Sequence, residues 1–331
     1  MIRGRRWVQN DRAGPSHRCR TPAPGRSGEN REAEGVPGFR DRVIDAVARG
    51  GPLCAGVDPS AELLVRWGLP DDESGLRDFS SRCLEAFDGV APVLKYQVAF
   101  FERHGAGGMQ VLEEAIATAR AAGSIVIADA KRGDIGSTAA AYAQAWLDPS
   151  SRLCADAVTA VPYMGLGALD PMFELARATG GGVIVVVRSS NPEGRWLQTA
   201  GVGAPSGTPE VVAPPGVTGT ATVEDTLLAS IAGLNRESGG TGHVGAVVGA
   251  TLEPSAFPLG SLGGVILSPG FGVQGGTAEH LARLFGGCEA GTVLANVSRS
   301  LLDAGPDVDS LRTRAMQLRA EITRALGPTL R

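Results

Sequence analysis

Eight short runs of β-branched and small apolar residues recur along the chain from residue 50 onward, and they constrain its fold more than any other feature. Turn residues and, in most cases, a stretch of helical periodicity follow each run, which is typical of repeated strand–helix units around a parallel sheet. Several runs are apolar without alternation, as expected of parallel strands covered on both faces. The runs are Leu53–Val57, Val93–Val98, Ile125–Ala128, Ala157–Val161, Val183–Val187, Val244–Ala250, Val265–Leu267 and Thr292–Ala295.

Eight such units predict an α/β fold of the closed (β/α)8 type, a TIM barrel. The chain has 331 residues, and barrels of about 250 residues commonly stand as one domain. An open, doubly wound sheet is the competing architecture. A dinucleotide fold of that kind would place a GxGxxG turn directly after the first strand, and none follows Leu53–Val57. The sequence therefore favours the barrel.

The amino-terminal segment differs in composition from the rest of the chain. Residues 1–34 hold eight arginines against four acidic residues, are rich in Gly, Pro and Ser, and have few apolar side chains. Such a segment cannot offset the entropy lost on ordering. We therefore predict a disordered tail over residues 1–35 and a single barrel domain over residues 36–331. An organellar presequence is the alternative, whereas a secretory signal would need an apolar stretch that is missing.

Charge and cysteine content exclude several classes of function. Beyond residue 34 the chain carries 23 basic against 31 acidic residues, so we expect no nucleic-acid partner. No run approaches the roughly 18 apolar residues of a membrane helix. The five cysteines form no CxxC pair and are odd in number, which argues against a zinc site or a disulfide framework. These observations favour a cytoplasmic protein that neither enters a membrane nor binds a metal.

Lysine is rare in this chain. Only Lys95 and Lys131 occur among 31 basic residues. Arginine does not readily release its proton, whereas a lysine has a pKa that shifts easily and an ammonium group that can donate a proton. Both lysines lie near the carboxyl end of a predicted strand, where barrels place catalytic groups. They are therefore candidates for chemistry, and the chance retention of two surface lysines is the alternative.

Acidic residues accompany the second lysine in the string Asp129-Ala-Lys131-Arg-Gly-Asp134-Ile. Asp129 and Lys131 are two residues apart in a segment expected to be extended just after the third strand, so their side chains should project to one face and form a charged pair. Asp134 and Thr138 should belong to the following turn and helix start. Taken alone, the string could also be an ordinary run of surface charges.

This string resembles the D-x-K-x-x-D-I signature of the orotidine 5′-phosphate decarboxylases. The resemblance extends from about Gly50 to Leu302, and the Asn-Pro after the fifth run is similar to the bacterial branch with longer loops. Further matching segments, in the order of the family, are Asp58 in Gly-Val-Asp-Pro-Ser, Lys95, Ser190 in Ser-Ser-Asn-Pro, Pro269-Gly-Phe-Gly-Val-Gln274-Gly-Gly and Ser298-Arg299-Ser300.

The resemblance implies decarboxylation of orotidine 5′-monophosphate to uridine 5′-monophosphate, the last step of de novo pyrimidine synthesis, with neither metal nor cofactor. It implies that Lys131 donates a proton and that Asp129 and Asp134 face the reacting carbon. It also implies a homodimer in which Asp134 and Thr138 cross into the neighbouring subunit's site. Lys95 is the fourth catalytic candidate and would extend the row of charges formed by Asp129, Lys131 and Asp134. Together with Asp58 it would hold the ribose hydroxyls.

The remaining substrate contacts also follow from the resemblance. Ser190 would contact the pyrimidine edge, and Gln274 and Arg299 would bind the phosphate beside the Pro269 loop. Independently, barrels often bind phosphate after strands seven and eight, and the glycines there permit close backbone approach; an ordinary loop is the alternative. The Gly-, Pro- and Thr-rich segment 201–222 is long for a connection inside a domain and could be a lid or a tolerated insertion.

Two other functions fit parts of the pattern. Sugar-phosphate decarboxylases and aldolases of the same barrel superfamily act through a magnesium enediolate and resemble one another in an E-x-D-x-K-x-x-D string. Ile127 occupies the position of that glutamate, so the metal-binding carboxylate is missing. A catalytically silent nucleotide-binding barrel could keep Arg299 yet lose Lys131, but the charged positions of the signature are intact. The sequence therefore favours the metal-independent decarboxylase.

Overall fold

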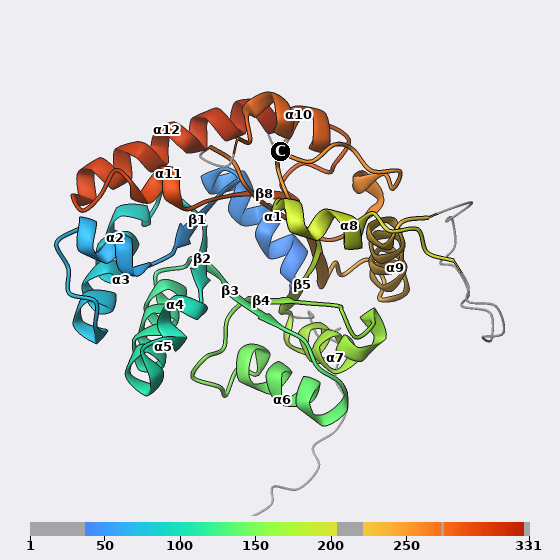
Figure 1. The fold of residues 1–331 in the computed structure, drawn as a ribbon, viewed down its shortest axis with the longest axis horizontal. Coiled ribbons are helices and arrows are strands. Elements are labelled where there is room, and N and C mark those ends of the chain that lie inside the picture. Colours follow the sequence, from blue (N-terminus) through green and yellow to red (C-terminus); the bar gives the residue numbers. More distant parts are fainter. Residues whose placement is uncertain (1–36, 204–220, 273–274, 328–331) are drawn as a thin grey trace, which may run out of the picture. The chain divides into compact units, whose positions relative to one another are not determined.

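Eight parallel strands form a closed barrel in the order β1-β2-β3-β4-β5-β6-β7-β8 (Figure 1). The computed structural model describes residues 37–203, 221–272 and 275–327. The predicted tail lies outside these ranges, as does most of the segment 201–222. The barrel confirms the predicted fold class, and each predicted run coincides with a strand. The strands are β1 Leu53–Val57, β2 Val93–Gln97, β3 Ile125–Arg132, β4 Ala157–Ala160, β5 Gly182–Arg188, β6 Val244–Val248, β7 Ile266–Pro269 and β8 Val293–Val297.

Helices surround the strands in Figure 1 and bury the outward-facing strand residues. None of the helices in the described ranges is long and apolar enough to cross a membrane. Short 3-10 turns occupy Leu166–Leu169, Pro192–Gly194 and Leu259–Ser261. The helices are α1 Phe39–Gly50, α2 Ala61–Arg66, α3 Glu73–Phe87, α4 Ala99–Glu102, α5 Gly105–Ala121, α6 Gly136–Leu147, α7 Asp170–Thr179, α8 Arg195–Gln198, α9 Val223–Glu237, α10 Ala278–Phe285, α11 Arg299–Leu302 and α12 Val308–Leu326.

Strand residues alternate between the helical layer and the barrel interior, as the two-residue period of a strand requires. On β2, Leu94 and Tyr96 pack with the surrounding helices, whereas Val93 packs inside the barrel. The interior cluster is separate from the outer layer and almost wholly apolar. Its strand and strand-edge members are Cys54, Val93, Ile125, Ile127, Ala157, Ile184, Val247, Val265, Leu267 and Leu294.

Helix α1 closes the amino-terminal end of this interior. Phe39 and Val43 are fully buried in the same cluster as the inward-facing strand residues. In Figure 1 α1 lies in the middle of the ring of strands. A Cβ atom at Gly182, the first residue of β5, would overlap the Phe39 ring. The apolar end of the barrel is therefore filled by a helix that precedes the first strand.

The barrel interior becomes polar two residues after the last apolar position on several strands. Because successive inward positions rise toward the carboxyl ends, the polar layer lies at the end opposite α1, where enzymes with this fold bind their substrates. Its buried members are Lys95, Asp129, Thr159 and Asn296, which follow Val93, Ile127, Ala157 and Leu294 respectively.

We expect Phe39→Ala to lower the free energy of unfolding by about 3–5 kcal/mol, because it leaves a cavity between α1 and the strands. Urea denaturation measures this loss. Met316→Ala on α12 is a control, since Met316 is 49% exposed and surface truncations usually change stability by less than about 0.5 kcal/mol. A Phe39→Ala loss as small as that of the control would contradict the role assigned to α1.

Candidate active site

A cavity of about 320 Å³ opens at the carboxyl ends of the strands. Seven of the ten residues predicted from the sequence line it, although they come from six different strands or strand ends. The structure therefore brings together most of the predicted site. The seven residues are Asp58, Lys95, Asp129, Lys131, Ser190, Pro269 and Arg299.

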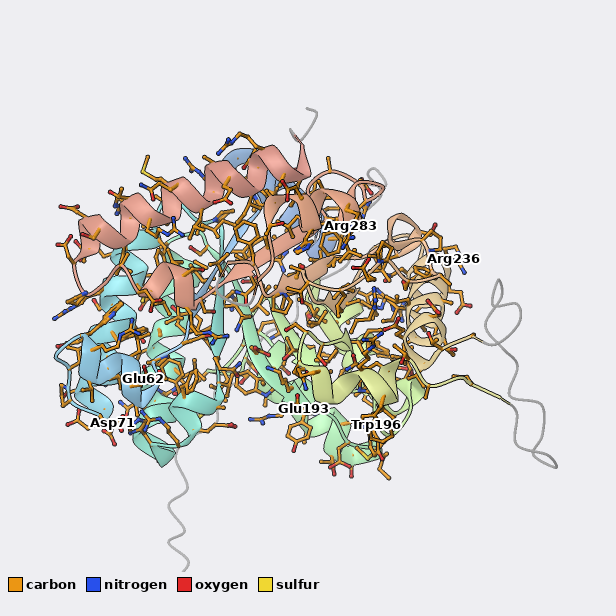
Figure 2. The ribbon with its side chains drawn as sticks, turned by 45° about the horizontal axis from the view of Figure 1, so that its top comes forward. Glu62, Asp71, Glu193, Trp196, Arg236 and Arg283 are labelled. Atoms are coloured by element: carbon orange, nitrogen blue, oxygen red, sulfur yellow. The ribbon has the colours of Figure 1, made fainter. Side chains whose placement is uncertain are left out.

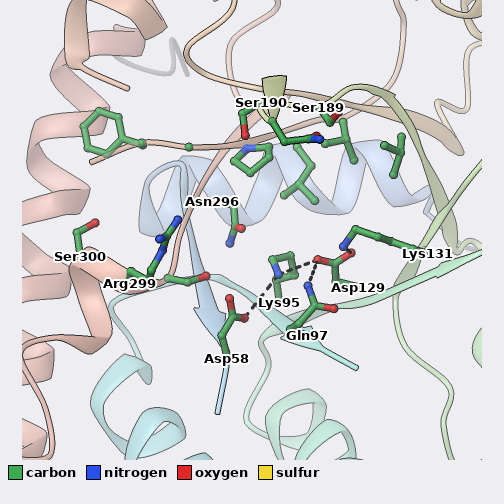
Figure 3. A pocket seen from close by; sticks show the side chains of 18 residues that line it. Asp58, Lys95, Gln97, Asp129, Lys131, Ser189, Ser190, Asn296, Arg299 and Ser300 are labelled. Carbon is green, nitrogen blue, oxygen red and sulfur yellow. Dashed lines mark hydrogen bonds and ion pairs between the residues drawn. The ribbon is translucent and has the colours of Figure 1, made fainter. Parts of the chain in front are cut away.

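Asp129 lies between the two lysines of the chain, as Figure 3 shows. Lys131 Nζ is 2.7 Å from Asp129 Oδ1, and Lys95 Nζ is 3.0 Å from Asp129 Oδ2. The predicted Asp129–Lys131 pair is thus confirmed. On its other side Lys95 Nζ is 3.7 Å from Asp58 Oδ1, so opposite charges alternate along a row from Asp58 to Lys131.

Burial and neighbouring charges oppose each other in this row. Burial alone would raise the pKa of Asp129, but Lys95 and Lys131 outweigh it and hold that pKa well below its usual range. Burial would likewise lower the pKa of Lys95, but Asp129 and Asp58 raise it well above its usual value. Asp129 and Lys95 therefore both stay charged across the neutral range.

The two lysines differ in exposure. The Lys95 side chain is 5% exposed and the Lys131 side chain 50% exposed. Lys95 is consequently enclosed by its carboxylate partners, whereas Lys131 presents its ammonium group to the cavity. Of the two, Lys131 has the accessibility that a proton donor requires.

The backbone at Lys131 is unusual. Its φ of 46° makes it the one non-glycine residue with positive φ among those described, and the β3–β4 pairing shifts register between Ala128 and Arg132. The sequence predicts that Lys131 follows the third strand and that plain strand alternation aligns it with Asp129. The structure differs in that β3 continues to Arg132 and the pair forms across a bulge.

Two residues not predicted from the sequence complete the surroundings of Asp129. Gln97 Nε2 donates to Asp129 Oδ2 at 2.8 Å, and Thr159 Oγ1 donates to Asp129 Oδ1 at 2.9 Å. Each carboxylate oxygen thus accepts from one lysine and one neutral group. The signal for Gln97 was present in the sequence, because it lies two positions after Lys95 on the same face of β2.

Asn296 is a third unpredicted residue of the cavity. It is buried on β8, and its Nδ2 donates to the Cys54 carbonyl oxygen at 3.1 Å. It lies two positions before Ser298 on the inward-facing side of its strand. The family signature does not mark it, so only strand alternation could have found it.

Two predicted residues do not line the cavity of their own chain. Asp134 Oδ1 accepts from the Ile135 backbone N–H at 2.8 Å, and Thr138 is exposed on the first turn of α6. Neither belongs to the cavity lining. Gln274 lies outside the described residues, so its predicted role is untested.

The loop after β5 is fixed by two sets of polar contacts. Ser189 N–H donates to Gln198 Oε1 at 3.0 Å, and Gln198 Nε2 donates to Ser189 Oγ at 2.7 Å. Beneath them, Arg188 Nε donates to Glu224 Oε2 at 2.8 Å, and both side chains are buried. These contacts place Ser190 at the rim of the cavity.

The fold and the cavity define a barrel enzyme with a buried row of alternating charges at the carboxyl ends of its strands. Residues 51–313 match the family model described as orotidine 5′-phosphate decarboxylase / HUMPS family. The chain belongs to this family.

Curated relatives agree over nearly their whole length. An orotidine 5′-phosphate decarboxylase of Salinispora arenicola is 46% identical over 288 residues, covering 87% of this chain and 98% of that protein. One of Corynebacterium efficiens is 45% identical over 287 residues, covering 86% and 96%. The family resemblance deduced from the motifs is therefore confirmed.

Solved structures share the fold. A protein from Streptomyces avermitilis has a TM-score of 0.77 and 44% identity, covering 90% of this chain and 99% of that one. The OMP decarboxylase of Leishmania donovani has a TM-score of 0.66 and 29% identity, covering 87% and 98%. The barrel described above is accordingly the fold of the family.

The lowered pKa of Asp129 gives its contribution to stability a definite sign. An aspartate in an unfolded chain has a pKa of about 3.9. Because the folded value is lower, the carboxylate stabilises the fold above that pH, and the stabilisation is lost as pH falls through the folded pKa. We expect the stability difference between wild type and Asp129→Asn to shrink from about pH 5 to about pH 2, as urea denaturation can measure. A difference that stays constant would contradict this expectation.

Proposed function

We propose that this chain is a carboxy-lyase that converts orotidine 5′-monophosphate to uridine 5′-monophosphate without a metal or cofactor. The single observation that carries the proposal is the Lys95–Asp129–Lys131 arrangement at the mouth of the barrel. This arrangement holds the Lys95 ammonium group in a buried position and presents that of Lys131 to the cavity. The curated relatives of the chain are orotidine 5′-phosphate decarboxylases.

The reaction needs a localised negative charge to be stabilised. Breaking the bond between C6 of the pyrimidine and its carboxylate releases CO₂ and leaves the electron pair on C6, in the plane of the ring. An ammonium group aimed at C6 stabilises this charge and then transfers its proton to the carbon. Lys131 is assigned this role, and its neutral amine afterwards regains a proton from water.

Repulsion between Asp129 and the substrate carboxylate contributes less in this proposal. Two like charges 4 Å apart at an effective dielectric near 20 repel by roughly 4 kcal/mol, equivalent to about three decades of rate. Both oxygens of Asp129 already accept from a lysine and a neutral donor, which offsets much of that charge. The proposal therefore rests on stabilisation of the carbanion by Lys131 and not on this repulsion.

The predicted substrate contacts are arranged along the cavity. In Figure 3 Arg299 lies across the cavity from Lys131, and Ser190 lies at its rim. This separation suits a substrate with its phosphate at one end and its reacting carbon at the other. We assign Arg299 and Gln274 to the phosphate, Asp58 and Lys95 to the ribose hydroxyls, and Ser190 to the pyrimidine edge beside Pro269.

We also propose a homodimer in which Asp134 and Thr138 reach the neighbouring site. Both lie away from the cavity of their own chain. Beside them Ile135 is 60% exposed and Tyr163 81% exposed, and the two loops meet where Val161 N–H donates to the Arg132 carbonyl oxygen at 2.8 Å. Trp196, on α8 in the connection after β5, is 75% exposed (Figure 2). On the two loops joined by that backbone hydrogen bond, the exposed Ile135 and Tyr163 side chains support an interface, because contiguous exposed apolar surface marks protein contacts.

The domain organisation and cellular setting complete the proposal. We infer one barrel domain over residues 36–331, and the tail predicted over residues 1–35 lies outside the described residues. The described cysteines Cys54, Cys83, Cys154 and Cys288 are all free thiols, which supports a reducing, cytoplasmic setting.

The alternative functions have weaker support. A magnesium-dependent sugar-phosphate enzyme would need a carboxylate where Ile127 is buried in the barrel interior. A catalytically silent barrel gives no reason for two charged lysines to be held on one carboxylate, since burying charge is costly.

The decisive test follows the absorbance of orotidine 5′-monophosphate during incubation with EDTA-treated protein. Wild type should turn over, and Lys131→Ala should lose at least about 10³-fold in kcat, because both charge stabilisation and proton donation are removed. Lys131→Arg is the matched variant: it keeps the positive charge but should remain severely impaired, since arginine holds its proton. Turnover only with added magnesium, or undiminished turnover by Lys131→Ala, would refute the proposal.

Mixing two inactive variants tests the dimer. In a mixed dimer of Lys131→Ala and Asp134→Ala chains, one of the two sites contains neither substitution. Refolding the variants together in equal amounts should therefore restore about a quarter of wild-type activity, as expected for a symmetric dimer with shared sites. The variants refolded separately are the control. No gain on mixing would show that Asp134 acts within its own subunit.

A further inference from the structure

Lys131 holds a backbone conformation that a lysine does not favour. Its φ of 46° lies in the left-handed region, where a Cβ atom crowds the backbone and side chains other than those of Gly, Asn and Asp are uncommon. Such conformations persist only where the surrounding structure fixes them, and they gather at functional sites. The contacts that hold the Lys131 backbone in this conformation therefore influence the direction in which its ammonium group points.

Thr159 on β4 supplies the contact. Its hydroxyl accepts a hydrogen bond from the Lys131 backbone N–H at 2.9 Å and donates to Asp129 Oδ1 at 2.9 Å. The side chain is fully buried. One hydroxyl proton serves Asp129, so the oxygen lone pairs remain for Lys131, and both bonds can exist together.

The position of Thr159 in the sheet explains why a side chain is needed. Ala128 pairs with Val158 and Arg132 pairs with Ala160, so the three residues of β3 from Asp129 to Lys131 face Thr159 alone. The regular ladder is interrupted there, as in a bulge. The Thr159 hydroxyl takes the place of the missing backbone acceptor for Lys131.

We propose that Thr159 is a positioning residue for the decarboxylation, which sets the direction of the Lys131 ammonium group through the backbone and through Asp129. This inference rests on the proposed function. Without the hydroxyl, the Lys131 N–H loses its partner and the backbone relaxes toward negative φ, which turns the side chain away from its position beside Asp129. Asp58, just after β1, and Arg299, at the start of α11, are assigned to substrate binding and stay in place, so the loss falls on kcat and not on KM.

Thr159→Val removes the hydroxyl with little change in shape, and Thr159→Ser keeps it. We expect Thr159→Val to lower kcat by about 10²-fold, the typical cost of a misplacement near 1 Å, with KM within about threefold of wild type. Thr159→Ser should return kcat to within about threefold of wild type. The matched control is Thr292→Val. Thr292 is also buried and donates to the Glu289 carbonyl oxygen at 2.7 Å just before β8, at the other end of the barrel, so this variant should keep full activity.

Crystal structures of wild type and the variants separate this inference from the proposed function. The φ of Lys131 should be positive in wild type and Thr159→Ser, and negative in Thr159→Val with Nζ displaced from Asp129. The φ of Lys131 can be compared in this way whether or not wild type decarboxylates orotidine 5′-monophosphate. An unchanged Lys131 in Thr159→Val overturns the inference, as does unchanged kcat, a loss confined to KM, or an equal loss of activity in Thr292→Val.

Discussion

The charged groups of the site depend on one buried carboxylate, Asp129. Burying an isolated charge is costly, and here four donors offset the cost: two ammonium groups, an amide and a hydroxyl. The donors come from three adjacent strands, so the carboxylate also joins β2, β3 and β4 at their carboxyl ends. Removing Asp129 would therefore affect the charge of the site and the local fold together.

One end of the barrel is packed with apolar side chains that stabilise the fold, and the other end carries the polar groups of the site. Around α1 the interior is apolar and closed by Phe39 and its neighbours, which gives the strands a packed foundation. Two positions further along the strands, the same interior face carries the buried charges of Lys95 and Asp129. The rigid lower layer thus supports a polar upper layer whose side chains have little freedom to reorganise, which is the condition for effective electrostatic catalysis.

Much of this arrangement was predictable from sequence, because it follows from local pattern. The eight strands follow from β-branched runs, and the importance of Lys95 and Lys131 follows from their rarity in an arginine-rich chain. Thr159 could not be predicted in the same way. Its role depends on the register shift between β3 and β4, and register across neighbouring strands is set by tertiary packing. The positive φ of Lys131 is hidden for the same reason, since a lysine at that position suggests ordinary extended backbone.

The buried Arg188–Glu224 pair joins β5 to α9 below the rim of the cavity. Arg188 ends β5, and Glu224 lies in the first turn of α9. The ion pair therefore holds the residue where the connection between these elements begins close to the residue just after it ends. The free-energy cost of closing a connection grows only slowly with its length. Because the ion pair fixes the two ends of this connection, a change in its length has little effect on Ser190 at the rim of the cavity. Insertions and deletions between Gly203 and Ala221 should therefore leave the position of Ser190 largely unchanged.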